Sequence, residues 1–199
     1  KSRGVAATFE SARDLLRRVS RSFYLSLRFL PADVRAPMSL AYLLARASDT
    51  LADSATASAE EKRDALAAFA AAVQGAGAAE GTVTLPVTDP AEAELLARTP
   101  ELLAWLASAP EAERALVRRV LAVIIEGQSE DLARTTVATE AELDRYTWQV
   151  AGCVGEFWTR LCALKQPAFA RSGHLDPLVK DGIRFGKGLQ LVNILRDVP

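Results

Sequence analysis

Apolar residues recur at helical spacing along most of the chain, and no alternating run of the kind found in strands exceeds a few residues. The first amphipathic segment carries its apolar positions at Phe9, Ala12, Leu15, Leu16 and Val19. Proline, glycine or capping residues separate further expected helices at 33–53, 92–106, 111–134, 140–164 and 181–199, and in an alanine-rich stretch after 58. The pattern therefore predicts an all-α protein.

One polar stripe interrupts an otherwise apolar helix at residues 41–53. This first stripe consists of Tyr42, Arg46, Asp49 and Asp53, which fall within about 60° of one another when each residue turns the helix by about 100°. A helix that is apolar around the rest of its circumference is expected to be buried. Its charged groups must then be paired or face a polar cavity, because unpaired buried charge is costly.

Two chemical interpretations fit the first stripe. Asp49 and Asp53 are one turn apart, about 6 Å along the helix axis, so their oxygens can share hard divalent cations. Magnesium usually completes its octahedral shell with water and substrate phosphate, and a pair of carboxylates suits that habit. In the other interpretation, Arg46 forms an intrahelical salt bridge with Asp49 while Asp53 caps the helix end.

A second stripe occurs in the last expected helix. Gln190, Asn193 and Asp197 lie within about 60° of one another, and the packing side is expected to hold Leu189, Val192, Ile194 and Leu195. Two acidic stripes on two buried helices, if they face each other, would enclose an anionic cavity for several magnesium ions and a diphosphate. A polar cluster that hydrogen bonds across a helix interface is the alternative.

Composition and charge exclude several classes of protein. The chain has 199 residues, half of them hydrophobic, and no linker is evident, so one domain over 1–199 is expected. The net charge is −1, so the chain lacks the excess of basic residues that is typical of nucleic-acid-binding proteins. No apolar run reaches the length of a membrane-spanning helix, and the first residues lack the apolar region of a signal peptide. Cys153 and Cys162 are expected to be buried free thiols in a reducing cytoplasm.

Smaller polar features add candidates. Ser20, Arg21 and Ser22 interrupt helical propensity and can present hydroxyls, N–H groups and a guanidinium to an anion. Composition alone favours the other interpretation, an N-cap beside a surface arginine. Gln128 and Asp131 share one face of a later helix, where a role for Asp131 is the less favoured interpretation.

Four blocks of sequence carry a resemblance to a known family. They are SRSF at 20–23, DTLAD at 49–53, YTWQVAGCVG at 146–155 and GLQLVNILRD at 188–197. In this order they resemble the signature blocks of the squalene and phytoene synthase family, whose members join two isoprenyl diphosphates head to head. The resemblance implies the isoprenoid-synthase helical bundle around a central cavity.

The resemblance also implies roles for individual residues. Mg²⁺, with Mn²⁺ as an alternative, would be held by Asp49, Asp53, Asn193 and Asp197, and would assist departure of the diphosphate. Tyr146 would guide the carbocation or transfer a proton. Substrate contacts would come from Ser20, Arg21, Ser22, Phe23, Tyr42, Arg46, Val150, Ala151, Gly155, Gln190 and Asn193. The small residues Ala151 and Gly155 admit either a neighbouring helix or a polyprenyl chain at close range.

The wording of the SRSF and LARASDTLAD segments looks closest to squalene synthases. The implied reaction condenses two farnesyl diphosphates through presqualene diphosphate to squalene, with NADPH as reductant, although no GxGxxG fingerprint is present. Alternatives are a phytoene or dehydrosqualene synthase acting on the same or longer prenyl diphosphates, and a synthase that forms presqualene diphosphate or hydroxysqualene. From another class, a non-catalytic helical lipid-binding or assembly subunit is also consistent.

The protein is expected to be a cytoplasmic monomer. Peripheral association with a membrane is a further hypothesis, because the substrate and product are strongly apolar. Family members are typically half as long again, and the second aspartate of the last motif would lie one turn beyond Asp197. The chain is therefore expected to be incomplete at its C-terminal end.

Overall fold

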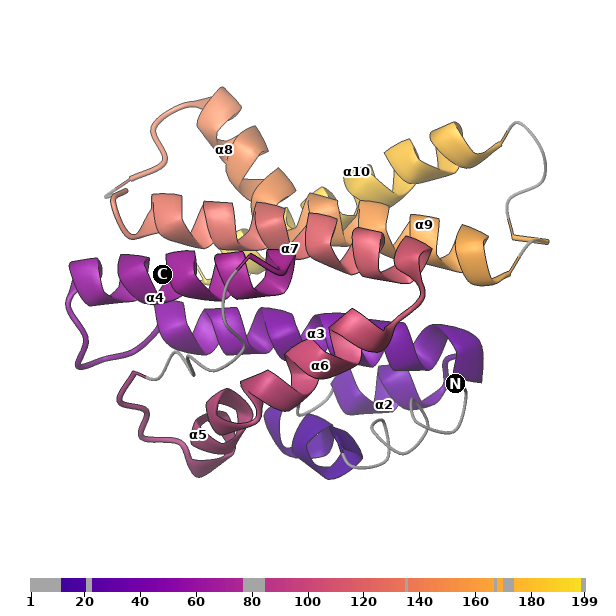
Figure 1. The fold of residues 1–199 in the computed structure, drawn as a ribbon. Coiled ribbons are helices and arrows are strands. Elements are labelled where there is room, and N and C mark those ends of the chain that lie inside the picture. The colour runs from indigo at the N-terminus through magenta and orange to yellow at the C-terminus, as the bar shows by residue number, and fades with distance from the viewer. Residues whose placement is uncertain are drawn as a thin grey trace. The chain divides into compact units, whose positions relative to one another are not determined.

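The computed structural model describes residues 12–20, 23–76, 85–134, 136–166, 168–169 and 174–197 (Figure 1). Residues 12–20 are helical. The other helices are α2 (Phe23–Arg28), α3 (Ala32–Ala52), α4 (Ala59–Gln74), α5 (Pro90–Ala97), α6 (Thr99–Ser108), α7 (Glu111–Asp131), α8 (Glu140–Thr147), the π-helix η1 (Trp148–Gly152), α9 (Cys153–Lys165) and α10 (Leu175–Asp197). No strand occurs in these ranges, so the prediction of an all-α protein is confirmed.

The chain divides into two compact units, Lys1–Leu121 and Ala122–Pro199, and passes from the first to the second within α7. In the first unit, α3 is the central element, since it contacts α2, α4, α5 and α6. Leu43, Leu44 and Leu51 of α3 are fully buried. Each such side chain contributes roughly 1.5–3 kcal/mol by leaving water, so core packing rather than surface ion pairing holds this helix in place.

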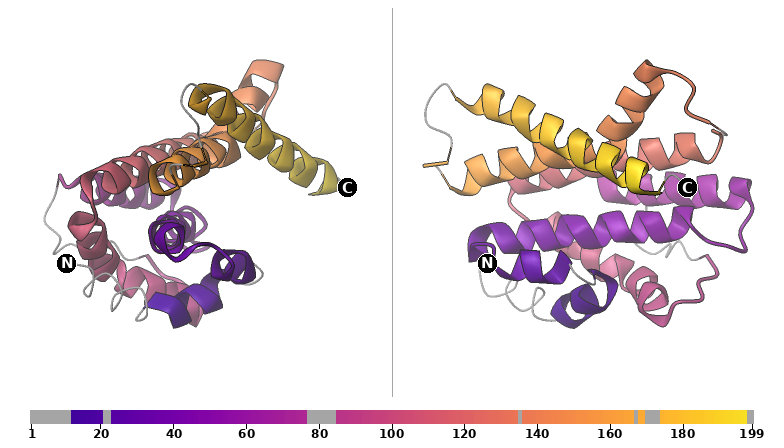
Figure 2. Two further views of the ribbon diagram at one scale, coloured as in Figure 1. Left: turned by 90° about the vertical axis from the view of Figure 1, so that its right-hand side faces the viewer. Right: turned by 180° about the vertical axis from the view of Figure 1, so that it is seen from behind.

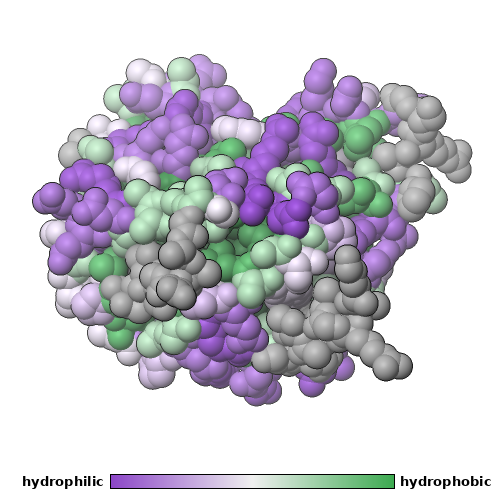
Figure 3. All heavy atoms as spheres, viewed as in Figure 1, coloured by the Kyte–Doolittle hydropathy of each residue, from purple (hydrophilic) through white to green (hydrophobic). Residues whose placement is uncertain are grey.

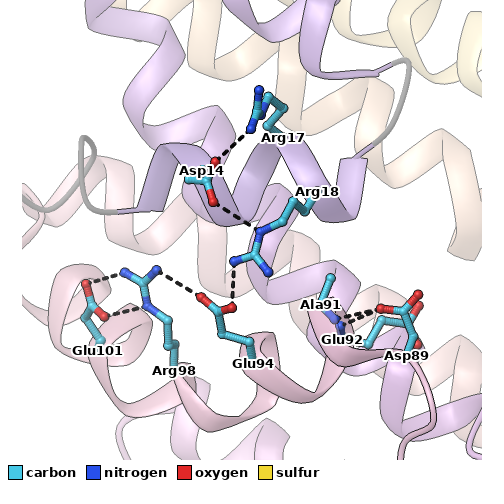
Figure 4. A network of polar contacts seen from close by, with 9 residues as sticks. All are labelled: Asp14, Arg17, Arg18, Asp89, Ala91, Glu92, Glu94, Arg98 and Glu101. Atoms are coloured by element: carbon cyan, nitrogen blue, oxygen red, sulfur yellow. Dashed lines mark hydrogen bonds and ion pairs between the residues drawn. The ribbon is translucent and has the colours of Figure 1, made fainter.

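A surface network ties helix 12–20 to α5 and α6 (Figure 4). Arg18 bonds to Asp14 on its own helix and to Glu94 of α5 at 2.6 Å. Arg98 then pairs with Glu101 of α6 through two hydrogen bonds of 2.9 Å. Exposed pairs of this kind each contribute about 0–1 kcal/mol, so the network mainly sets the position of helix 12–20, which leads into the SRSF block.

In the second unit, α10 lies along η1 and α9 (Figure 2). Glycines make the contact close. A Cβ atom added at Gly155 would collide with the carbonyl oxygen of Gly182, and one added at Gly186 would collide with that of Ala151. The two backbones can approach this closely only because those positions carry no side chain.

The close packing corrects one expectation about the last helix. Leu189, Val192 and Leu195 were expected on its packing side, but they are 52%, 62% and 74% exposed. The side that packs closely instead carries Gly182 and Gly186, because small residues permit the shortest approach between helices. Those three apolar side chains therefore lie at the surface of α10. On the face drawn in Figure 3, hydrophobic side chains also lie among hydrophilic ones over α9 and the start of α10. Within the described ranges, no helix combines the length and apolar character needed to cross a membrane.

Candidate functional site

The first stripe lies where the sequence pattern placed it. Tyr42, Arg46 and Asp49 are half-buried and Asp53 is exposed, while the leucines between them are buried. The helix ends at Ala52, and the N–H of Asp53 donates to the carbonyl oxygen of Asp49 at 2.8 Å. Asp49 and Asp53 are thus one turn apart at the C-terminal end of α3, and Asp49 is 44% exposed at its side chain.

The Arg46 guanidinium has its tightest contact outside α3. It forms a hydrogen-bonded ion pair with Glu92 of α5, whereas its Nη1 atom is 3.9 Å from the nearest Asp49 oxygen. Glu92 is held at the third position of α5, because Asp89 caps that helix by accepting from the N–H groups of Ala91 and Glu92. The intrahelical Arg46–Asp49 pair is therefore present but long, and Glu92 is the main anchor of Arg46.

The two carboxylates of the first stripe fit a magnesium ion that relies on further ligands. Among the described residues, no group of three or more histidine, cysteine, aspartate or glutamate side chains is arranged to hold a metal. Magnesium characteristically takes one or two carboxylates and completes its shell with water and substrate phosphate. Asp49 and Asp53, partly or fully open to solvent, match that donor set.

Aromatic contacts connect the SRSF block to the first stripe. The rings of Phe23 and Tyr42 stack with centroids 5.1 Å apart and an interplanar angle of 27°. The Tyr42 hydroxyl donates to the carbonyl oxygen of Val19 at 3.5 Å, and the buried Ser20 hydroxyl donates to that of Leu16 at 2.5 Å. Ser20 thus uses its hydroxyl within its own helix. The candidates Arg21 and Ser22 lie outside the described residues.

The third block contains a feature that periodicity did not predict. Tyr146 is half-buried near the end of α8 and is followed by η1, which includes the half-buried Val150 and Ala151. Short π-helical segments are rare and frequently occur at functional sites. The sequence suggested that either a neighbouring helix or a polyprenyl chain lies close to Gly155. The structure shows a helix there, because the backbone of α10 lies against Gly155.

Polar groups of α7 brace this π-helix. Glu130 accepts from Arg145 at 3.1 Å and from the buried amide of Gln149 at 3.1 Å, and it pairs with Arg134 at 3.4 Å. The hydrogen bond from Arg145 is the largest cause of a pKa of Glu130 below its ordinary value. Gly127 makes room for the Gln149 side chain, since a Cβ atom there would lie 2.8 Å from that of Gln149. Within the polar patch noted around Gln128 and Asp131, Glu130 is thus the residue that contacts Arg145, Gln149 and Arg134.

Burial changes the pKa of two other groups in this unit. Partial burial is the largest cause of a raised pKa for Asp131, and the charge of Arg134 opposes it. Burial raises the pKa of the Cys153 thiol to about 12, so this thiol is protonated and inert at neutral pH. Neither cysteine forms a disulfide; Cys153 is buried as expected, whereas Cys162 is only half-buried.

The second stripe lies in the exposed half of α10. Gln190 is half-buried, while Asn193 and Asp197 are exposed, and Asp197 bonds to Arg196 at 3.1 Å. These residues belong to the second unit and the first stripe belongs to the first unit. The expectation that both stripes contribute to one cavity stays a prediction.

Sequence features did not identify Glu92 or Glu130 beforehand. Glu92 reads as an ordinary acidic residue in the first turn of a helix, and Glu130 as one of several acids near a helix end. The only signal for Glu92 is its fixed place three residues after an Asp-Pro helix start.

Comparisons with known proteins agree with the four sequence blocks. The profile of the family described as squalene/phytoene synthase matches residues 16–199. A bifunctional lycopene cyclase/phytoene synthase of Phaeosphaeria nodorum is 31% identical over 188 residues, which are 92% of this chain and 31% of that protein. A presqualene diphosphate synthase of Zymomonas mobilis is 29% identical over 182 residues, which are 90% of this chain and 52% of that protein.

A solved structure supports the same relationship. TcSQS, in complex with the ligand BPH1237, superposes with a TM-score of 0.81 at 26% identity, and the match covers 96% of this chain and 54% of that one. The chain thus spans from about a third to about half of the length of these relatives.

Proposed function

Because this chain belongs to the squalene/phytoene synthase family, we propose that it acts in the head-to-head joining of two prenyl diphosphates, with magnesium assisting departure of diphosphate. The observation that carries the proposal is the first stripe. It places two carboxylates one turn apart beside an arginine that a neighbouring helix holds in place. This is a donor set for a magnesium diphosphate.

The chain's own residues would divide the work of the first step. Asp49 and Asp53, together with Asn193 and Asp197 of the second stripe, would hold the metal. Bound magnesium supplies positive charge that neutralises the leaving diphosphate. Arg46 would donate to diphosphate oxygens from the orientation that Glu92 fixes.

Other candidates would bind the rest of the substrate. Ser20, Arg21 and Ser22 are proposed to contact the diphosphate. Because the Ser20 hydroxyl is engaged with Leu16, the other two are the better donors. Val150, Ala151, Gly155 and Gln190 are proposed to lie along the prenyl chains.

Aromatic groups suit the cationic part of the reaction. The stacked Phe23 and Tyr42 rings would offer a negative π-face to an allylic cation, and the Tyr146 phenol would guide the cation or transfer a proton. In the joining step, the double bond of one prenyl chain attacks the allylic carbon of the other. The carbon–oxygen bond to diphosphate breaks, a proton is lost, and a cyclopropyl diphosphate forms. Apolar walls would keep water from quenching the cation.

The product we favour is squalene, formed from two farnesyl diphosphates with NADPH as the reductant. Phytoene or dehydrosqualene formation is the main alternative, because one relative is a phytoene synthase fused to a cyclase. A product that stops at presqualene diphosphate is a second, because another relative is named for it. A purely structural subunit is disfavoured by the presence of Asp49, Asp53 and Asp197.

The decisive experiment supplies the full-length protein with farnesyl or geranylgeranyl diphosphate and magnesium, with and without NADPH, and identifies products by mass spectrometry. Squalene that appears only with NADPH would establish the favoured product. Presqualene diphosphate, hydroxysqualene, dehydrosqualene or phytoene would assign one of the sister activities. If neither substrate is consumed while Mg²⁺ is present, the proposed activity is wrong.

A further inference from the structure

A polar cavity lies within the first unit, and none of the residues of the first stripe lines it. It has a volume of about 240 Å³ and is enclosed by helix 12–20, α2 and α3. Its lining residues are Arg13, Leu16, Tyr24, Leu27, Arg28, Arg35 and Ser39. We call this the arginine pocket. Three guanidinium groups and no carboxylate are among the lining residues, so its local charge is strongly positive.

The arginine pocket and the acidic site share one face of α3. Arg35 and Ser39 lie on the same helical face as Tyr42, Arg46 and Asp49, because the spacing repeats every three or four residues. Ser39 and Arg46 are seven residues apart, roughly 10 Å along the axis. Tyr42, stacked on Phe23, lies between them, so the arginine pocket is a separate compartment.

Ser39 provides a hydrogen-bonding group that the protein itself does not use. The residue is only 1% exposed, and its hydroxyl has no hydrogen-bond partner among the described residues. Buried hydroxyls in native proteins almost always have a partner, which can be a ligand or an ordered water. An unused donor in a pocket of arginines indicates that the missing partner is an acceptor.

The orientation and free donor groups of two of these arginines also suit the binding of an anion. Arg35 donates from Nε at 3.2 Å and from Nη2 at 2.7 Å to the carbonyl oxygen of Leu30, which fixes the plane of its guanidinium. Its Nη1 makes no hydrogen bond within the described part of the chain, and Arg28 has no ion pair there. Planar guanidinium groups match phosphate oxygens in both geometry and charge.

We propose that the arginine pocket binds a small phosphate-type anion, with Arg28, Arg35 and the Ser39 hydroxyl as donors. Pockets for whole organic ligands usually measure about 300–1,000 Å³, so this one suits a phosphate or diphosphate group rather than a complete prenyl diphosphate. The proposal does not depend on the reaction proposed above, since it uses none of the residues assigned to that reaction.

The phosphate group has two conceivable sources. One is free inorganic phosphate or diphosphate. The other is the headgroup of a phospholipid, because Leu25 of α2 and Phe29 directly after that helix are 58% and 84% exposed and would meet the acyl region. Both sources present the same chemistry to the pocket, and the experiment separates them.

The test measures binding to the full-length protein in the presence of EDTA, so that magnesium cannot bridge an anion to the carboxylates. Radiolabelled inorganic diphosphate or phosphate is used in equilibrium dialysis. Sedimentation with vesicles of phosphatidylcholine, with or without phosphatidic acid, forms the second arm. Arg28→Gln and Ser39→Ala should each weaken binding about tenfold. Arg63→Gln, which removes an exposed arginine of α4 outside the pocket, should leave it unchanged.

Each result decides the proposal. Saturable binding of the free anion that depends on Arg28 and Ser39 supports a small-anion site. Binding only to vesicles that contain phosphatidic acid, with the same dependence, supports a headgroup site. The proposal is overturned by a lack of binding in both arms, by binding that Arg46→Gln abolishes, or by equal losses in Arg28→Gln and Arg63→Gln. Ser39→Ala removes an unpartnered buried hydroxyl and should therefore fold at least as well as the parent protein.

Discussion

Individual side chains carry the chemistry proposed for this chain, and two of them, Asp49 and Asp53, contribute little to its packing. The Asp49 side chain is 44% exposed and Asp53 is exposed, unlike the buried leucines between them. Replacing them therefore separates a loss of function from a loss of fold.

We expect Asp49→Asn or Asp53→Asn to lower kcat by roughly three orders of magnitude, because each removes a charged magnesium ligand. The thermal midpoint should change little. Product formation from farnesyl diphosphate and circular dichroism melting would measure the two effects. Asp64→Asn, at an exposed position on α4, is the matched control. Near-normal turnover in either variant would contradict the metal assignment.

Glu92 acts through Arg46 and is therefore a positioning residue. Without its carboxylate, the nearest acidic oxygen to Arg46 is 3.9 Å away on Asp49. We expect Glu92→Gln to raise KM for the prenyl diphosphate by about three- to tenfold with a smaller effect on kcat, because substrate binding loses an oriented guanidinium. Stability should fall by about 1 kcal/mol at most, since the pair is partly exposed. A Glu60→Gln control on α4 should change neither, and a fall in kcat alone would refute this role.

At the scale of whole elements, the contact of α10 with η1 and α9 depends on residues that have no side chain. Gly186 lies against the backbone of Ala151, whereas Gly188, two positions later on the same helix, has nothing within 4 Å of an added Cβ atom. Substituting each glycine by alanine therefore compares a position in close helix contact with an open position on the same helix.

We expect Gly186→Ala to destabilise the second unit by roughly 1–3 kcal/mol, because the added methyl group forces two backbones apart. Gly188→Ala should stabilise it by about 0.5–1 kcal/mol through helix propensity alone. Urea unfolding monitored by circular dichroism would give both values. Equal effects of the two substitutions would mean that α10 does not pack on η1 as described.

The link between α7 and α8 should make stability depend on pH. The folded pKa of Glu130 is held below its ordinary value of 4.5 by Arg145, so Glu130 stabilises the fold above that pH and loses this contribution as the pH falls through the folded pKa. The folded pKa of Asp131 is raised above 3.8, so its effect has the opposite sign: its contribution is lost as the pH rises through the folded pKa.

We therefore expect Glu130→Gln to flatten the loss of stability between neutral pH and pH values below 4.5, because the titrating carboxylate is gone. Urea midpoints at several pH values would measure the slope. Asp131→Asn serves as the comparison and should not flatten this loss. An unchanged slope in Glu130→Gln would show that Arg145 does not hold this carboxylate.

For the whole molecule, the four family blocks are divided between the two units. SRSF and DTLAD belong to the first unit, whereas Tyr146–Gly155 and the second stripe belong to the second unit. The proposed reaction requires all of them, so neither unit should be active alone.

Kinetics can test whether the two stripes act on one substrate. If Asp49 and Asp197 serve the same metal-bound diphosphate, Asp49→Asn and Asp197→Asn should each abolish most activity, and the double variant should be no worse than the poorer single variant. Initial rates with farnesyl diphosphate and magnesium would establish this. Losses that multiply in the double variant would mean that the stripes act independently.

The sequence alone determined the helical class, the buried and polar faces of α3, and the family relationship. The first two follow from local periodicity, because a helix places residues three and four apart on one side whatever lies around it. The alternation of Leu43, Leu44 and Leu51 with the first stripe was therefore readable in advance. The family relationship rests instead on the four sequence blocks and on the profile that matches residues 16–199.

The tertiary structure alone decided which distant groups meet. It paired Arg46 with Glu92, turned α10 so that its glycines and not its leucines pack closely, and left Ser39 without a partner among three arginines. None of these contacts has a fixed spacing in the chain, because helix packing depends on how closely two backbones can approach. The periodicity of the sequence shows which face of a helix is apolar, but only the packing of neighbouring helices decides which face is buried.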